Sequence, residues 1–208
     1  MYRKLMISVR MGLLFALGWF VASERCAGHD FLSDEEVQWI RDHPVVRVGV
    51  DPDYPPYSFR DRSLGYEGVS LDYLEWIGDK TGLRFEPVPG LTWTQVLEQA
   101  VARDLDLVTN IVKSPGREDF LLFSEPYIRT PLVIVTRKDM PALEVQDLAG
   151  GKLSVALVSN YASSKRVIRD IPDLNGHHYQ SPLEALLAVS LGKTDVFVGI
   201  LGATDYLS

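Results

Sequence analysis

The stretch that decides the fold is Arg47–Phe59, which reads RVGVDPDYPPYSF. Alternating valines predict a short buried strand over Val46–Val50, because every second side chain of a strand lies on the same face. The strand runs directly into a loop with three prolines, two acids and two aromatic rings. Since proline fixes φ, the loop holds Tyr54 and Tyr57 in place before any ligand arrives. A stiff aromatic loop at a strand end is typical of a binding surface.

The composition excludes several classes of function. The chain has 208 residues, 46% apolar and 24% charged, which is enough for one or two domains with a real core. Its net charge is −7, and no basic block lies outside the first ten residues, so we expect no nucleic-acid partner. Its one cysteine, Cys26, excludes an intrachain disulfide and a cysteine metal cluster. We expect no metal and no cofactor.

The N-terminus resembles an export signal. Arg3, Lys4 and Arg10 precede an apolar run over residues 11–22. That run is short for a membrane-spanning helix, which needs about 20 apolar residues. We therefore expect residues 1–27 to be a signal peptide, with an uncleaved N-terminal anchor as the alternative. Either one places the rest of the chain in the periplasm.

Strands and helices alternate along the exported part. A lead-in segment over residues 28–44 contains a predicted helix, in which Ser33 and Glu36 form a capping box and Pro44 ends the helix. The expected strands are Val46–Val50, Arg84–Val88, Leu105–Thr109, Pro131–Arg137, Lys152–Val158 and Asp195–Val198. The expected helix caps are Ser70, Thr92, Ser114, Ser159 or Asn160, and Ser181, the last as a full capping box with Glu184. This order predicts an α/β fold with mostly parallel sheets flanked by helices.

The alternation occurs twice, which predicts two lobes. Lobe 1 is expected over residues 45–130 and lobe 2 over residues 131–208. The sequence stops about one turn into a new helix, with no closing strand. We therefore expect an incomplete lobe 2, without the return of the chain to lobe 1.

Several motifs follow one another in an order that resembles a known family. They are RVGVDPDYPPYSF, Gly68–Asp72, Asp106–Asn110, Ser114–Glu118, Phe123–Tyr127, Pro131–Arg137, Asp147–Gly150 and Gly192–Asp195. The series resembles the family-3 periplasmic solute-binding proteins, two-lobed Venus flytrap domains. The lead-in segment is similar to the one that precedes such domains in Bvg-type sensor histidine kinases.

The resemblance implies a function in ligand sensing. It implies the input domain of a membrane-bound sensor, with a kinase or cyclase as output, that binds a small carboxylate-bearing solute by closure of the lobes. One alternative is a free binding protein that delivers amino acids or related solutes to an ABC permease. Another is the flytrap domain of a lytic transglycosylase or a dehydratase. No Ser-His-Asp spacing, glycine-rich phosphate loop or HExxH motif appears in the sequence, so we leave enzymatic activity open.

On the lobe-1 side, the resemblance implies ligand contacts from the opening loop. Tyr54 matches the ring that stacks on the ligand, and Tyr57 matches an aromatic position behind it. Asp51 matches a position that borders the ligand, although a turn acid bonded to its own loop is an equal alternative. Thr109 and Asn110 match the positions of polar contacts.

Arg117 and the start of a lobe-2 helix complete the implied site. Arg117 lies in the first turn of a helix, where the helix dipole opposes a cation. In the family's amino-acid binders the matching arginine forks onto the ligand carboxylate. The alternative is a salt bridge to Glu118, Asp119 or Glu125. Three lobe-2 positions match donors to the same carboxylate, or serve as plain helix caps: Ser159, Asn160 and Tyr161.

One position departs from the family pattern. The acid that pairs with a ligand ammonium in the amino-acid binders is replaced here by Ile200. An isoleucine leaves a buried cation uncompensated. The sequence therefore disfavours an ordinary α-amino acid and favours a carboxylate without an amine, an aromatic acid, or no small ligand.

Overall fold

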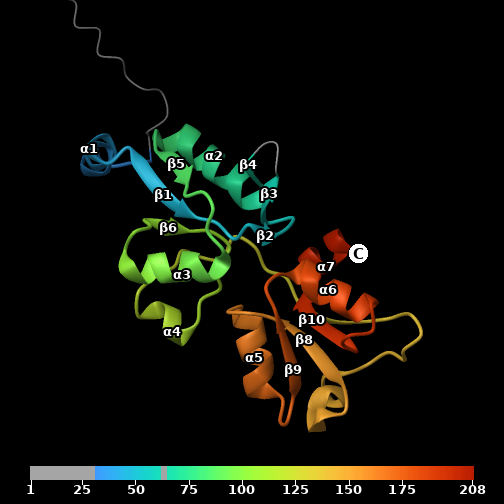
Figure 1. Ribbon diagram of the computed structural model, residues 1–208. Coiled ribbons are helices and arrows are strands. Elements are labelled where there is room, and N and C mark those ends of the chain that lie inside the picture. The colour runs from blue at the N-terminus through green and yellow to red at the C-terminus, as the bar shows by residue number, and fades with distance from the viewer. Residues whose placement is uncertain (1–30, 62–64) are drawn as a thin grey trace, which may run out of the picture.

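The computed structural model describes residues 31–61 and 65–208. The ribbon shows two α/β lobes, one blue to green and one orange to red, joined by an extended yellow-green segment (Figure 1). The predicted signal peptide or anchor lies outside the described residues. The lead-in helix is present as α1 (Asp34–Asp42).

Lobe 1 is built on a small parallel sheet in the order β5-β1-β6. Its strands are β1 (Val45–Gly49), β5 (Arg84–Pro87) and β6 (Leu107–Val108). Its helices are α2 (Val69–Thr81), α3 (Trp93–Ala102) and α4 (Pro115–Glu118). Val48 and Val50 are fully buried, so the alternation of valines in the opening stretch is confirmed.

The proline-rich stretch forms a small sheet that the sequence did not predict. Three antiparallel strands follow β1 in the order β2-β3-β4. They are β2 (Asp53–Tyr54), β3 (Ser58–Asp61) and β4 (Gly65–Glu67). Tyr54 pairs with Ser58, whose hydroxyl donates to the Asp51 carbonyl oxygen at 2.9 Å. The loop is therefore rigid because of backbone pairing as well as its prolines.

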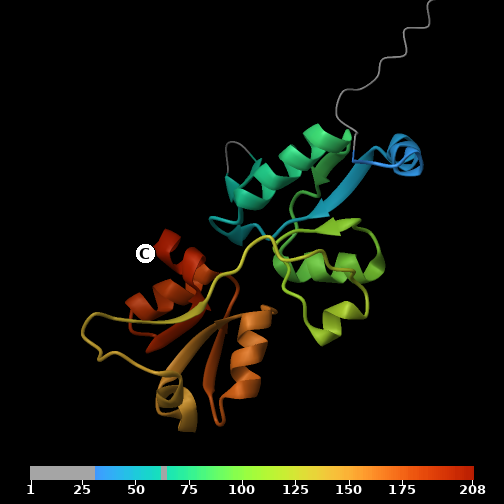
Figure 2. The ribbon, with the colours of Figure 1, turned by 180° about the vertical axis from the view of Figure 1, so that it is seen from behind.

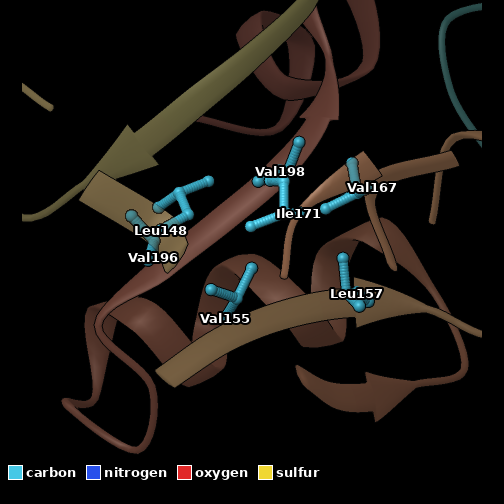
Figure 3. Close-up of a cluster of buried hydrophobic side chains, with 7 residues drawn as sticks. All are labelled: Leu148, Val155, Leu157, Val167, Ile171, Val196 and Val198. Atoms are coloured by element: carbon cyan, nitrogen blue, oxygen red, sulfur yellow. The ribbon is translucent and has the colours of Figure 1, made fainter. Parts of the chain in front are cut away.

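Lobe 2 contains a four-stranded mixed sheet in the order β7-β10-β8-β9. Its strands are β7 (Leu132–Thr136), β8 (Ser154–Val158), β9 (Asn175–Tyr179) and β10 (Val196–Ile200), with β7 antiparallel to β10. Its helices are η1 (Val145–Gly151), α5 (Ala162–Asp170), α6 (Pro182–Ser190) and α7 (Leu201–Leu207). Apolar side chains from η1, β8, α5 and β10 fill one face of the sheet (Figure 3). The predicted two-lobed α/β fold is confirmed.

The predicted helix starts are confirmed for α1 and α3, where the capping residues are three positions apart in the sequence. Ser33–Glu36 and Thr92–Gln95 both form reciprocal capping boxes. Ser181 caps α6, but the prediction of a full box was wrong, because the Glu184 carboxylate accepts from the Gln180 amide instead.

Two predicted caps are wrong. Helix α2 begins after Gly68, whose φ of 117° suits glycine, and Ser70 lies inside the helix. Helix α5 begins after Tyr161, so neither Ser159 nor Asn160 caps it. The next section shows that Ser70 and Asn160 instead make contacts across the fold.

Candidate functional site

The loop after β1 presents a buried acid. The Asp51 side chain is 4% exposed, and its Oδ1 accepts a hydrogen bond from the Asp53 amide at 3.0 Å. This bond is the one expected for a turn acid. Burial raises the pKa of Asp51 to about 6, although its hydrogen bonds act in the opposite direction. The carboxyl group therefore titrates near neutral pH.

The second Asp51 oxygen is bonded from the other lobe. The Tyr161 hydroxyl, at the start of α5, donates to Asp51 Oδ2 at 2.5 Å. The Tyr161 ring meets Tyr54 edge-on at 5.5 Å and Trp93 at 6.2 Å between centroids. Burial raises the pKa of the Tyr161 phenol, so it remains a hydrogen-bond donor. Tyr161 thus occupies the space beside Tyr54, where the resemblance implied that a ligand stacks.

Asn160 adds backbone contacts between the lobes. It adopts a left-handed conformation with φ of 60°. Its carbonyl oxygen accepts hydrogen bonds from Arg117 Nη2 at 3.1 Å and from Trp93 Nε1 at 3.4 Å. Its side-chain amide donates to Thr94 Oγ1 at 2.9 Å. We call the set Asp51, Trp93, Arg117, Asn160 and Tyr161 the interlobe contact.

Arg117 is a buried cation without an acidic partner in the described part of the chain. Its side chain is packed over the Trp93 ring, 5.6 Å from the centroid, and the residue is 7% exposed. Besides Asn160, its acceptor is the Val112 carbonyl oxygen at 2.9 Å. None of the salt bridges considered from the sequence, to Glu118, Asp119 or Glu125, forms, and Glu118 pairs with Lys113 at 2.8 Å instead. Loss of hydration lowers the pKa of Arg117, as expected for an uncompensated buried charge.

Two predicted polar residues lie in a separate cluster. The Thr109 hydroxyl donates to the Gly49 carbonyl oxygen at 3.5 Å. The Asn110 side chain contacts Ser70 and Tyr127, and Tyr127 OH donates to Asn110 Oδ1 at 3.1 Å. These bonds fix the end of β6 beside α2.

The remaining predicted residues take structural positions. Tyr57 is buried, 5.1 Å from the Tyr54 ring, and its hydroxyl lies against Gly202 of α7. The Ser159 amide donates to the Tyr179 carbonyl oxygen at 2.9 Å. Trp93 and Thr94 were not among the site residues predicted from the sequence, although both contact Asn160. The cap at Thr92 could have indicated both, since it places the next two side chains at the cleft.

Two cavities lie beside the interlobe contact. A pocket of about 10 Å³ lies beside Tyr54, Tyr161 and Ile200, room for about one water molecule. A groove of about 1030 Å³ lies on the other side, where α3 and α4 of lobe 1 face α5 of lobe 2 (Figures 1 and 2). We call it the outer groove. Arg117 and Ile200 both line it, so its chemistry combines a buried cation with an apolar wall.

Residues 31–61 and 65–208 lack two further features, a metal-ligand group and a membrane-spanning helix. No group of three or more His, Cys, Asp or Glu side chains there is arranged to hold a metal ion. No helix in those ranges is both long and apolar enough to cross a membrane.

Two α/β lobes that face each other across a cleft define a periplasmic-type binding protein. The model of the bacterial extracellular solute-binding proteins, family 3, matches residues 46–199, and the chain belongs to that family.

Its relatives include sensors of two organisms. The chain is 34% identical over 170 residues to the virulence sensor protein BvgS of Bordetella pertussis, covering 82% of this chain and 14% of the relative. It is 31% identical over 167 residues to the sensor protein EvgS of Escherichia coli K12, covering 80% of this chain and 14% of the relative. The chain thus spans about one seventh of these relatives and is homologous to their flytrap domains.

A solved structure and a cystine-binding protein complete the comparison. The crystal structure of the Bordetella pertussis BvgS periplasmic VFT2 domain superposes with a TM-score of 0.72 at 34% identity, covering 84% of this chain and 74% of that one. The L-cystine-binding protein TcyA of Bacillus subtilis is 27% identical over 157 residues, covering 71% of this chain and 58% of the relative.

Proposed function

We propose that this chain is the ligand-sensing periplasmic domain of a membrane-bound sensor histidine kinase, and that it binds a small carboxylate-bearing solute between its lobes. The relatives with 31–34% identity support the sensor role. One observation carries the ligand class: Arg117 is buried at the cleft, and no carboxylate partner of it lies among the described residues. A buried cation is stable when it is paired, and a ligand carboxylate supplies the pair.

The mechanism follows from the interlobe contact. Asn160 and Tyr161 of lobe 2 bond to Arg117 and Asp51 of lobe 1, and these bonds stabilise the closed arrangement of the lobes. A carboxylate at Arg117 competes with the Asn160 carbonyl oxygen for the guanidinium. It therefore has different affinities for the closed and open arrangements and shifts their populations. The output domain reads that shift.

Calorimetric titration of the full chain tests the ligand class. We expect small carboxylates to bind, and α-amino acids to bind no more tightly than the matched acids, since Ile200 offers their ammonium no partner. Arg117→Lys keeps the charge but removes the planar fork, so carboxylate binding weakens about tenfold. Failure of every carboxylate to bind would refute the proposal. Tight binding of α-amino acids would show that the inference from Ile200 is wrong.

The reading frame tests the signalling role. If the sensor role is right, the gene that encodes this chain should also encode a membrane span and a histidine kinase domain. A second candidate, a free binding protein of an importer, is favoured by the similarity to TcyA. A frame that ends after the lobes, beside permease genes, would support that candidate and contradict the sensor role.

A further inference from the structure

The lobe-1 side of the outer groove is apolar. Leu97 and Val101 of α3 and Val112 before α4 line it. Val101 and Val112 are 58% and 57% exposed, although both belong to a lobe with a well-filled core. Exposed valines gain free energy when an apolar group covers them. This wall therefore fits the apolar body of a ligand.

The opposite wall is cationic and comes from α5. Lys165, Arg166 and Arg169 line the groove, and their spacing of three and four residues places them on one side of the helix. Arg166 and Arg169 share a single acid, Asp170. Lys165 forms no ion pair in the described part of the chain.

The groove as a whole therefore has an excess of positive charge. Its lining residues include five cations and one acid, Glu98. This excess is local, because the entire chain carries a net charge of −7. Among these five cations Arg117 is buried, and it has no acidic partner among residues 31–61 and 65–208.

We propose that the outer groove binds a small dicarboxylate with an apolar spine. One carboxylate pairs with Arg117, the spine covers Val101 and Val112, and the second carboxylate meets Lys165 and Arg166 on α5. The volume of about 1030 Å³ is ample for such a molecule, since ligand pockets span about 300–1000 Å³. Because its two ends contact different lobes, this ligand reports on their separation. The inference rests on the proposed function, since it names the ligand class of the same cleft.

Calorimetry with matched probes tests the second anchor. Pimelate carries two carboxylates, heptanoate has the same length and one, and a diamine of the same length reverses the charge. We expect pimelate to bind about 5- to 10-fold more tightly than heptanoate, a modest factor because the α5 cations are exposed. The diamine should not bind. The advantage of pimelate should shrink as ionic strength rises above about 0.15 M.

Variants of the full chain locate the anchor. Lys165→Gln combined with Arg166→Gln should abolish the advantage of pimelate and leave heptanoate binding unchanged. The matched control is Lys193→Gln, an exposed lysine outside the groove lining, which should alter neither affinity.

The outcomes separate this inference from the proposed function. Heptanoate binding that depends on Arg117, with no advantage for pimelate, would overturn the second anchor alone. If Lys193→Gln also abolished the tighter binding of pimelate, the second anchor would be overturned, because the loss would then not depend on the α5 cations. If neither acid binds, both proposals fail.

Discussion

Tyr161→Phe removes one oxygen atom from the interlobe contact and leaves the ring in place. The lost group is the donor to Asp51 Oδ2, a carboxylate that is 4% exposed and keeps only the Asp53 amide among its observed side-chain partners. A hydrogen bond to a charged group contributes about 1.5–3 kcal/mol to the free energy of unfolding. We therefore expect a loss of about 2 kcal/mol at about pH 7.5, where most Asp51 is ionised.

The loss should depend on pH. At about pH 4.5 Asp51 is protonated, and a neutral hydrogen bond contributes only about 1 kcal/mol. For a chain of this size, the melting temperature should fall by about 4–8 °C at the higher pH and about 2–4 °C at the lower one. Thermal unfolding followed by circular dichroism measures both values.

A tyrosine within lobe 1 provides the matched control. Tyr66 OH donates to the Val88 carbonyl oxygen at 3.5 Å, a long and weak bond that does not join the lobes. Tyr66→Phe should therefore cost little at either pH. Equal losses for Tyr161→Phe and Tyr66→Phe, or a loss for Tyr161→Phe that is the same at both pH values, would refute the reasoning.

Three further predictions concern stability. Burial raises the pKa of Asp51 from 3.8 to about 6, so protonation of Asp51 stabilises the folded state. This contribution to the free energy of unfolding is complete below about pH 4. It is lost as the pH rises through about 6, a change of about 3 kcal/mol. Asp51→Asn should remove this pH dependence of the free energy of unfolding, measured by urea titration at several pH values. An unchanged pH dependence would contradict the raised pKa of Asp51. Gly202→Ala places a methyl group against the Tyr57 hydroxyl and should cost about 1–3 kcal/mol in urea titrations, with part of the loss restored by Tyr57→Phe. No restoration would show that the two do not clash. Thr92→Ala removes the α3 capping bonds with Gln95 and should lower the free energy of unfolding by about 1 kcal/mol in the same assay, so a neutral effect would count against the box.

The sequence revealed those parts of the fold that depend on local pattern. The valine alternation of β1 and the capping boxes of α1 and α3 involve residues within a few positions of one another, so their spacing carries the information. Strand β9 escaped notice because four of its five residues are exposed, which leaves no apolar alternation. Strands β2 and β4 have two and three residues, too few to show any period.

The sequence indicated the loop of the site but not the contacts between the lobes. The loop that carries Asp51 and Tyr54 could be recognised, because its prolines and rings are adjacent. The bond between Asp51 and Tyr161 joins residues 110 positions apart and depends on how the lobes are placed. For the same reason the sequence offered Asn160 only as a helix cap or a ligand contact, and it did not reveal that the Asn160 carbonyl oxygen accepts from Arg117.

The central claim is that the bonds of Asn160 and Tyr161 to lobe 1 hold the two lobes together. Electron-paramagnetic-resonance distances between labels at Trp76→Cys and Leu191→Cys, with Cys26→Ser, measure the separation directly, since both sites are exposed and lie on different lobes. We predict one narrow distance for the unliganded chain and a second population after Tyr161→Ala. A broad distribution that Tyr161→Ala leaves unchanged would contradict the claim.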